Sequence, residues 1–139
     1  MSTSVFVDTS ALYAALDADD HHHGRGAAGL ARLLDELERN AVEAVTHSSV
    51  VVEITALVQR RLGMTAVRAL LDDVLPPLHT VWVDADLHGQ AVTALLAANN
   101  RSVSLVDWTS FVVMRRLGLQ TAFAFDADFE RQGFSLYTV

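Results

Sequence analysis

The 139-residue sequence contains no cysteine, so neither a disulfide nor a thiolate metal site can contribute to its fold or its chemistry. Lysine is also absent, and all 10 basic residues are arginines, which excludes mechanisms that use an amine side chain. No apolar run reaches the roughly 20 residues that a membrane-spanning helix needs. We therefore expect a cytoplasmic protein that has no membrane partner.

The charge of the chain is unbalanced. Its 17 acidic residues outnumber the 10 basic ones, which gives a formal net charge of −7 at pH 7. Proteins bind nucleic acids largely through basic side chains that displace counterions, so this surface should repel nucleic acid overall. A polyanionic substrate would need help from a metal ion or from a local cluster of arginines.

The length and the 51% content of hydrophobic residues are those of one compact domain, which we place at residues 1–139. Short β-prone runs alternate with helical patterns about five times along the chain. The β-prone runs lie at residues 4–7, 41–46, 79–83, 102–106, 121–125 and 134–139. This alternation predicts an α/β fold with a mainly parallel central sheet of about five strands and helices on both faces.

Three of the β-prone runs end in an aspartate. The stretches VFVD, SLVD and FAFD end at Asp8, Asp107 and Asp126, respectively. The carboxyl ends of parallel strands share one edge of a sheet, and ligands bind at that edge. We therefore expect these three residues, which are distant in the sequence, to lie close together.

Two further acids accompany these aspartates. Asp128 lies two residues after Asp126, and Glu53 is the only charged residue of the segment 46–58, whose helical pattern is apolar on nearly every side. An unpaired carboxylate buried in such a helix would be costly and would tend to protonate. Taken alone, each aspartate is more often a helix N-cap, and Glu53 more often reaches solvent or pairs with an arginine.

Taken together, the acids favour a metal site. Carboxylates a few ångströms apart cannot all stay ionised without a cation, and the chain has no lysine to supply one. Hard oxygen ligands suit Mg²⁺ or Mn²⁺, which can make a water nucleophilic and neutralise charge at a phosphorus. The sequence thus predicts a divalent metal site. The ligands that we expect are Asp8, Asp107, Asp126 and Asp128.

Four motifs carry a resemblance to a known family. The stretches FVDTSAL, VVEITALV, SLVDWTSF and FAFDADF resemble, in order and spacing, the four acidic motifs of the PIN-domain ribonucleases, especially VapC-type toxins of toxin–antitoxin pairs. The resemblance implies Mg²⁺- or Mn²⁺-dependent endonucleolytic cleavage of RNA and a cognate antitoxin protein. It assigns the catalytic acids to Asp8, Glu53, Asp107 and Asp126, and supporting hydroxyls to Thr9, Ser10 and Thr109. Asp128 matches an acid that is less uniform in the family.

Other functions are weighed against this one. A PIN-fold RNA-processing nuclease without an antitoxin, and a non-catalytic module that binds metal or nucleic acid, remain alternatives. A phosphoacceptor receiver domain is excluded because it needs a lysine at its site. A haloacid-dehalogenase-like phosphatase is excluded because it needs an Asp-x-Asp motif, where this chain has Asp8, Thr9 and Ser10.

Assembly can also be anticipated from the sequence. The helical patterns at residues 48–62 and 64–75 are so apolar that they should leave patches larger than a monomer normally exposes. We therefore expect a homodimer. Trp82, in the β-prone run HTVWV, is expected in the core or in an interface.

The remaining aromatic and histidine residues are less specific. Trp108, beside Asp107, is expected to pack against the protein, with stacking on a nucleobase as the alternative. His21, His22 and His23 form a tract that is expected in a solvated loop. Metal binding, or a place on the substrate side by resemblance to related proteins, is the alternative for this tract.

Overall fold

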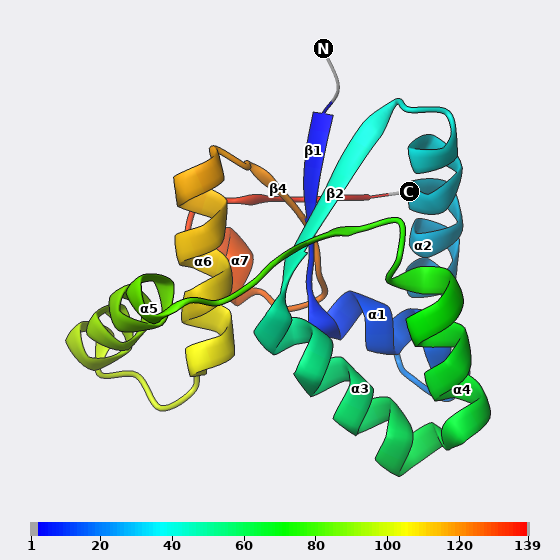
Figure 1. Ribbon diagram of the computed structural model, residues 1–139, viewed down its shortest axis with the longest axis horizontal. Helices are drawn as coiled ribbons and strands as arrows, with labels where there is room; N and C mark the ends of the chain where they lie inside the picture. The colour runs from blue at the N-terminus through cyan, green and yellow to red at the C-terminus, as the bar shows by residue number, and fades with distance from the viewer. Residues whose placement is uncertain (1–2, 139) are drawn as a thin grey trace.

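A parallel five-stranded sheet forms the centre of the computed structural model, which describes residues 3–138 (Figure 1). The strands stand in the order β3-β2-β1-β4-β5, and each neighbouring pair is parallel. Their bounds are β1 Thr3–Val7, β2 Val42–His47, β3 His79–Val81, β4 Thr121–Phe123 and β5 Ser135–Leu136. The predicted α/β fold with a parallel sheet of about five strands is confirmed.

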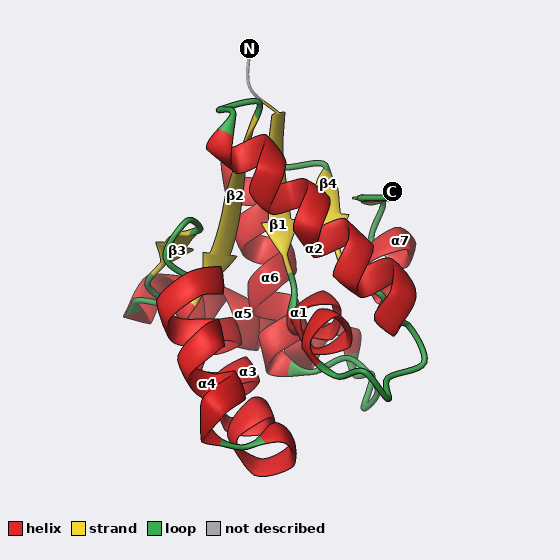
Figure 2. Ribbon diagram, turned by 90° about the vertical axis from the view of Figure 1, so that its right-hand side faces the viewer, coloured by secondary structure: helices red, strands yellow, loops and turns green. Residues whose placement is uncertain are grey.

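Helices cover both faces of this sheet, as the alternation predicted. Figure 2 shows α2 crossing in front of the strands and α6 lying behind them. The helices are α1 Thr9–Leu16, α2 His23–Glu38, α3 Ser48–Leu62, α4 Met64–Ala69 with the π-helical segment η1 Leu70–Val74, α5 Ala85–Ala98, α6 Leu105–Leu117 and α7 Asp128–Arg131. Within residues 3–138, every helix falls short of the length and apolar character needed to cross a membrane.

The core fixes the helices that carry the site. Val5, Phe6 and Val7 of the central strand β1 are buried, as expected of a run without polar alternation. Phe6 stacks on Phe129 of α7 with ring centroids 6.1 Å apart, and Phe111 of α6 meets Phe129 edge-on at 5.0 Å. These contacts hold the starts of α6 and α7, where the candidate aspartates lie, at one end of the sheet.

The prediction of a strand at residues 102–106 is wrong, because α6 begins within this run. Ser104 is the N-cap of α6: its hydroxyl accepts the N–H of Asp107 at 3.1 Å, and the Asp107 carboxylate accepts the N–H of Ser104 at 3.1 Å. This reciprocal pair is a capping box. The capping chemistry overrides the β-propensity of a short apolar run, so Asp107 stands in the first turn of a helix and not at a strand end.

Three other expected strands are shorter than predicted. The runs at 79–83, 121–125 and 134–139 form strands only over His79–Val81, Thr121–Phe123 and Ser135–Leu136, and Val139 lies outside the described residues. Trp82 follows the end of β3 and is 77% exposed, so it does not lie in the core as one reading predicted. Its place in an interface stays a prediction.

Candidate active site

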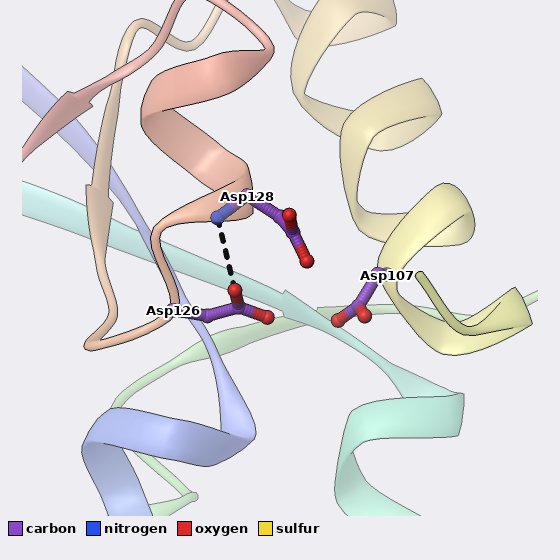
Figure 3. A group of neighbouring side chains, drawn as sticks. All are labelled: Asp107, Asp126 and Asp128. Carbon is purple, nitrogen blue, oxygen red and sulfur yellow. Dashed lines mark hydrogen bonds between the residues drawn. The ribbon is translucent and has the colours of Figure 1, made fainter. Parts of the chain in front are cut away.

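Three carboxylates converge beyond the carboxyl end of β4 (Figure 3). Asp107, Asp126 and Asp128 each offer one oxygen atom, and these oxygen atoms lie within 4.8 Å of one another. The side chains come from the first turn of α6, the loop after β4 and the start of α7. We call these three residues the acidic cluster. The structure thus brings together three of the four acids that the sequence offered as metal ligands.

Local hydrogen bonds fix each member of the acidic cluster. The capping box of α6 orients Asp107, as described above. Asp126 Oδ1 accepts the N–H of Asp128 at 2.9 Å, and this turn opens α7. Asp128 also pairs with Arg131, one turn further along α7, at 2.7 Å. The side chains are therefore held in place by bonds that leave other carboxylate oxygens facing the centre of the group.

Asp8 stands beside the acidic cluster but is not one of the three. It is the N-cap of α1, and its Oδ2 accepts both the N–H of Ser10 at 3.1 Å and the Ser10 hydroxyl at 2.6 Å. The same hydroxyl oxygen accepts the N–H of Phe125 at 2.9 Å, which ties α1 to the loop that carries Asp126. Capping and a place at the site therefore coincide in Asp8, although the sequence presented them as alternatives.

Electrostatics mark this region as a place for a cation. Burial raises the pKa of Asp8 to about 7; the Ser10 hydrogen bonds oppose this rise, and the charges of Asp107 and Asp126 add to it. Burial also raises the pKa of Asp107, against the opposing hydrogen bonds from Ser104. The pKa of Asp126 is raised by burial and by the charges of Asp107 and Asp128. The ionised form of each carboxylate is thus less stable here than in water, and a bound cation would stabilise it.

The residues present fit a hard divalent cation. Three carboxylate oxygens from three separate backbone positions lie close enough to share one ion. Mg²⁺ and Mn²⁺ prefer such oxygen ligands and usually retain several waters. The raised pKa values of Asp107 and Asp126 point the same way: burial is their main cause and the neighbouring carboxylates add to it, and a cation at the acidic cluster would stabilise both ionised groups.

Glu53 lies near Asp107 on α3. Its charge contributes to the raised pKa of Asp107, and its side chain is half-buried. Glu53 also lines a surface pocket of about 730 Å³, whose wall includes Val52, Trp82 and Val106. The structure therefore places Glu53 between the acidic cluster and an open pocket, and not with the three grouped carboxylates.

The hydroxyls assigned by resemblance have different surroundings. Ser10 bonds directly to Asp8, as described above. Thr9 Oγ1 is buried and has no hydrogen-bond partner within residues 3–138. Thr109 donates to the carbonyl of Leu105 one turn earlier in α6, at 2.8 Å. Of the three, Ser10 is the hydroxyl that the structure ties to a candidate acid.

Sequence reasoning missed two neighbours of the site. Arg131 pairs with Asp128, and the spacing of three residues on a helix was the available signal. The ring of Phe125 stacks on the ring of His22, with centroids 4.8 Å apart and an angle of 2° between the planes. This second contact joins residues that are about a hundred positions apart, so no local pattern indicates it. Trp108 packs edge-on against Phe111 at 5.3 Å, as expected.

The fold and site define an α/β domain with clustered carboxylates at the carboxyl edge of a parallel sheet. The sequence model of the PIN domain matches residues 5–135 of the chain. The chain is also 38% identical over 131 residues to the "23S rRNA-specific endonuclease VapC20" of two Mycobacterium tuberculosis strains, and the match covers 94% of this chain and 95% of that protein. The chain therefore belongs to the PIN domain family, as its motifs predicted.

Solved structures agree with this assignment. The crystal structure of Mycobacterium tuberculosis VapC20, described as a sarcin–ricin loop cleaving toxin, matches with a TM-score of 0.76 and 35% identity, over 94% of this chain and 95% of that one. FitAcB from Neisseria gonorrhoeae matches with a TM-score of 0.64 and 15% identity, over 96% of both chains. VapBC2 from Rickettsia felis, bound to a promoter DNA fragment, matches with a TM-score of 0.67 and 16% identity, over 96% of this chain and 97% of that one. The last two likenesses concern the fold alone.

Proposed function

We propose that this protein is a divalent-metal-dependent endoribonuclease and the toxin of a toxin–antitoxin pair. The observation that carries the proposal is the acidic cluster at the carboxyl edge of a PIN domain. The 38% identity to a 23S rRNA-specific endonuclease, across 95% of that protein, supports it. Structured ribosomal RNA is accordingly the substrate class that we assign, with the sarcin–ricin loop as the first candidate.

The proposed site uses the acids in two roles. Asp107, Asp126 and Asp128 would hold Mg²⁺, or Mn²⁺ in its place, and Asp8 would complete the ligand set. When bound, such an ion supplies charge neutralisation at the scissile phosphate and lowers the pKa of water. Ser10 holds the Asp8 carboxylate in one orientation through its two hydrogen bonds.

Glu53 completes the proposed catalytic set of Asp8, Glu53, Asp107 and Asp126. Its half-buried carboxylate lies near Asp107 and lines the open pocket, so it can accept a proton from the reacting groups and return it to solvent. We assign Glu53 to this proton exchange, and the other acids of the set to ion binding and charge balance.

The proposal includes partners and a setting. A cognate antitoxin would inhibit the enzyme by placing an arginine or lysine against the acidic cluster, where its charge replaces that of the ion. A homodimer would cover the exposed apolar side chains of Val52 and Trp82, which are 69% and 77% exposed and line the same pocket. The whole chain, residues 1–139, would form one nuclease domain that works in the cytoplasm.

Cleavage of ribosomal RNA tests the proposed function. Purified protein incubated with ribosomes and Mg²⁺ should produce a discrete 23S rRNA fragment whose new end maps to one loop. EDTA should abolish this product, and so should Asp126→Asn, which keeps the side-chain shape and an oxygen for the turn to Asp128. Asp86→Asn is the matched control and should cleave normally, because Asp86 lies on α5 in an exposed ion pair with Arg116 of α6. Equal cleavage in EDTA, or by Asp126→Asn, would contradict the proposal.

A further inference from the structure

Three side chains form a stack next to the acidic cluster. The ring of His22 lies parallel to that of Phe125, with centroids 4.8 Å apart. The guanidinium of Arg25 lies over the same Phe125 ring, 5.4 Å from its centroid. Phe125 directly precedes Asp126, so this stack begins one residue from the acidic cluster. We call Arg25, His22 and Phe125 the arginine platform.

The guanidinium of the platform is oriented by a histidine and an aromatic ring, and not by a carboxylate. Arg25 NH2 lies 3.2 Å from Nδ1 of His22. A guanidinium has only donors, so in this contact Nδ1 of His22 is the acceptor. Phe125 supports the cation through its ring face. Among residues 3–138, Arg25 pairs with no carboxylate, so its charge is not compensated by an ion pair.

The start of α2, which carries Arg25, has a fixed shape, and His23, expected in a solvated loop, is the first residue of this helix. The His22 N–H donates to Asp20 Oδ1 at 2.9 Å, and His23 Nδ1 lies 2.8 Å from the carbonyl oxygen of Ala14. At Gly26 a Cβ atom would come within 2.9 Å of Ala14, so α1 and α2 approach too closely for any side chain there. The start of α2 is thus locked against α1, which holds Arg25 over the ring of Phe125, the residue before Asp126.

We propose that Arg25, held by this platform, binds an RNA phosphate next to the scissile one. This inference rests on the proposed ribonuclease function. It supplies a local positive charge with which a protein of net charge −7 can bind RNA. Arg131, the other arginine at the site, is already paired with Asp128. Arg25 has most of its five N–H donors available, and a planar guanidinium matches the geometry of a phosphate. His22 and Phe125 orient it, and neither is a carboxylate that would offset its charge.

The salt dependence of RNA cleavage tests this contact. We would measure kcat/KM on a short RNA hairpin that the wild type cleaves, over a series of KCl concentrations at fixed Mg²⁺. Loss of one phosphate contact on a single strand should make the negative slope of log(kcat/KM) against log[salt] shallower by about 0.7, which is about a fivefold loss of kcat/KM at 0.1 M salt. Arg25→Gln should show this change through KM, with kcat unaltered.

Two variants separate the contact from a structural role. Arg39→Gln removes an arginine from the other end of α2, about 21 Å away at 1.5 Å per residue, where it pairs with Asp35. It should keep the wild-type slope. Arg25→Lys restores a cation and should recover the slope. A slope unchanged in Arg25→Gln, or equally changed in Arg39→Gln, would overturn the inference.

Binding without cleavage separates this inference from the proposed function. In the Asp126→Asn background, fluorescence anisotropy of the labelled hairpin with Mg²⁺ reports the contact without any cut. Arg25→Gln should weaken that binding about fivefold at 0.1 M salt, with the same loss of slope. If the wild type cleaves nothing but this loss appears, the proposed chemistry fails and the contact stands. If cleavage is normal and binding does not change, the contact fails alone.

Discussion

Replacing Asp8 with asparagine removes a buried negative charge and keeps an oxygen that accepts the Ser10 hydrogen bonds. Asp8 is 3% exposed, and burial raises its pKa to about 7. In the unfolded chain the pKa returns to its ordinary value of 3.8. The buried Asp8 carboxylate therefore lowers the free energy of unfolding of the metal-free protein at every pH at which Asp8 is ionised in the unfolded chain.

The sign and size of this effect follow from linkage. Well below pH 3.8, Asp8 is protonated in both states and its burial does not change the free energy of unfolding. The destabilisation grows as the pH rises through 3.8 and is complete above the folded pKa of about 7. The full cost is about 4 kcal/mol, because each pKa unit corresponds to 1.36 kcal/mol. Asp8→Asn lacks it, so the variant should gain about 2.5 kcal/mol relative to wild type between pH 5 and pH 8.

Urea unfolding of EDTA-treated protein at pH 5 and pH 8 measures this gain. Groups that do not interact with Asp8 titrate alike in both proteins and cancel in the comparison, provided that m is unchanged, while the removal of its charge also eases the ionisation of Asp107 and Asp126. Asp86→Asn is the control, because its carboxylate is 74% exposed in an ion pair and should show no such pH dependence. A difference between Asp8→Asn and wild type that is equal at both pH values would refute the burial argument.

Two other predictions concern stability and assembly. His47 is buried, its Nε2 lies 2.8 Å from the Ser110 hydroxyl, and burial lowers its pKa to about 4. Stability should therefore fall as the pH drops below the ordinary value of 6.5, by about 2 kcal/mol at pH 5, and His47→Gln should lack this loss in urea titrations; an equal loss in the variant would contradict it. Trp82→Asp should convert a homodimer into a monomer in analytical ultracentrifugation at tens of micromolar, with the far-UV circular dichroism of a folded protein; an unchanged dimer would rule out this surface.

Much of the fold could be predicted because hydrophobic pattern and local chemistry agree along most of the chain. The runs that form β1, β2 and β4 are mainly apolar, and each is followed by a segment that leads into a helix. Their positions therefore follow from the β-propensity of their residues. Residues 102–106 break this agreement. There, Ser104 and Asp107 form a capping box that only the three-residue spacing reveals, while the apolar residues between them suggest a strand.

The site was less predictable, because it depends on which loops meet. Asp107, Asp126 and Asp128 meet as expected, although Asp107 arrives from the first turn of a helix. Asp8 lies beside them and serves as a helix cap, so the capping hypothesis is confirmed, while its part in metal binding stays a prediction. The arginine platform joins residues about a hundred positions apart, because the start of α2 is locked against α1, and no local pattern contains that information.

Asp107→Asn tests the metal site most directly. Asparagine can keep the capping box with Ser104, so α6 should form as in wild type, and the metal-free variant should be at least as stable because one crowded charge is gone. For wild-type protein, Mn²⁺ at 100 times its Kd should raise the free energy of unfolding by about 2.7 kcal/mol. We would measure that increment by denaturation with and without Mn²⁺, together with cleavage of ribosomal RNA.

We expect Asp107→Asn to be folded and to gain no stability from Mn²⁺ at the same concentration. It should cleave RNA at least a hundredfold more slowly than wild type, which corresponds to an activation barrier higher by about 2.7 kcal/mol or more. A folded variant that still gains the wild-type increment from Mn²⁺ and cleaves RNA at the wild-type rate would contradict the assignment of the acidic cluster as the metal and catalytic site.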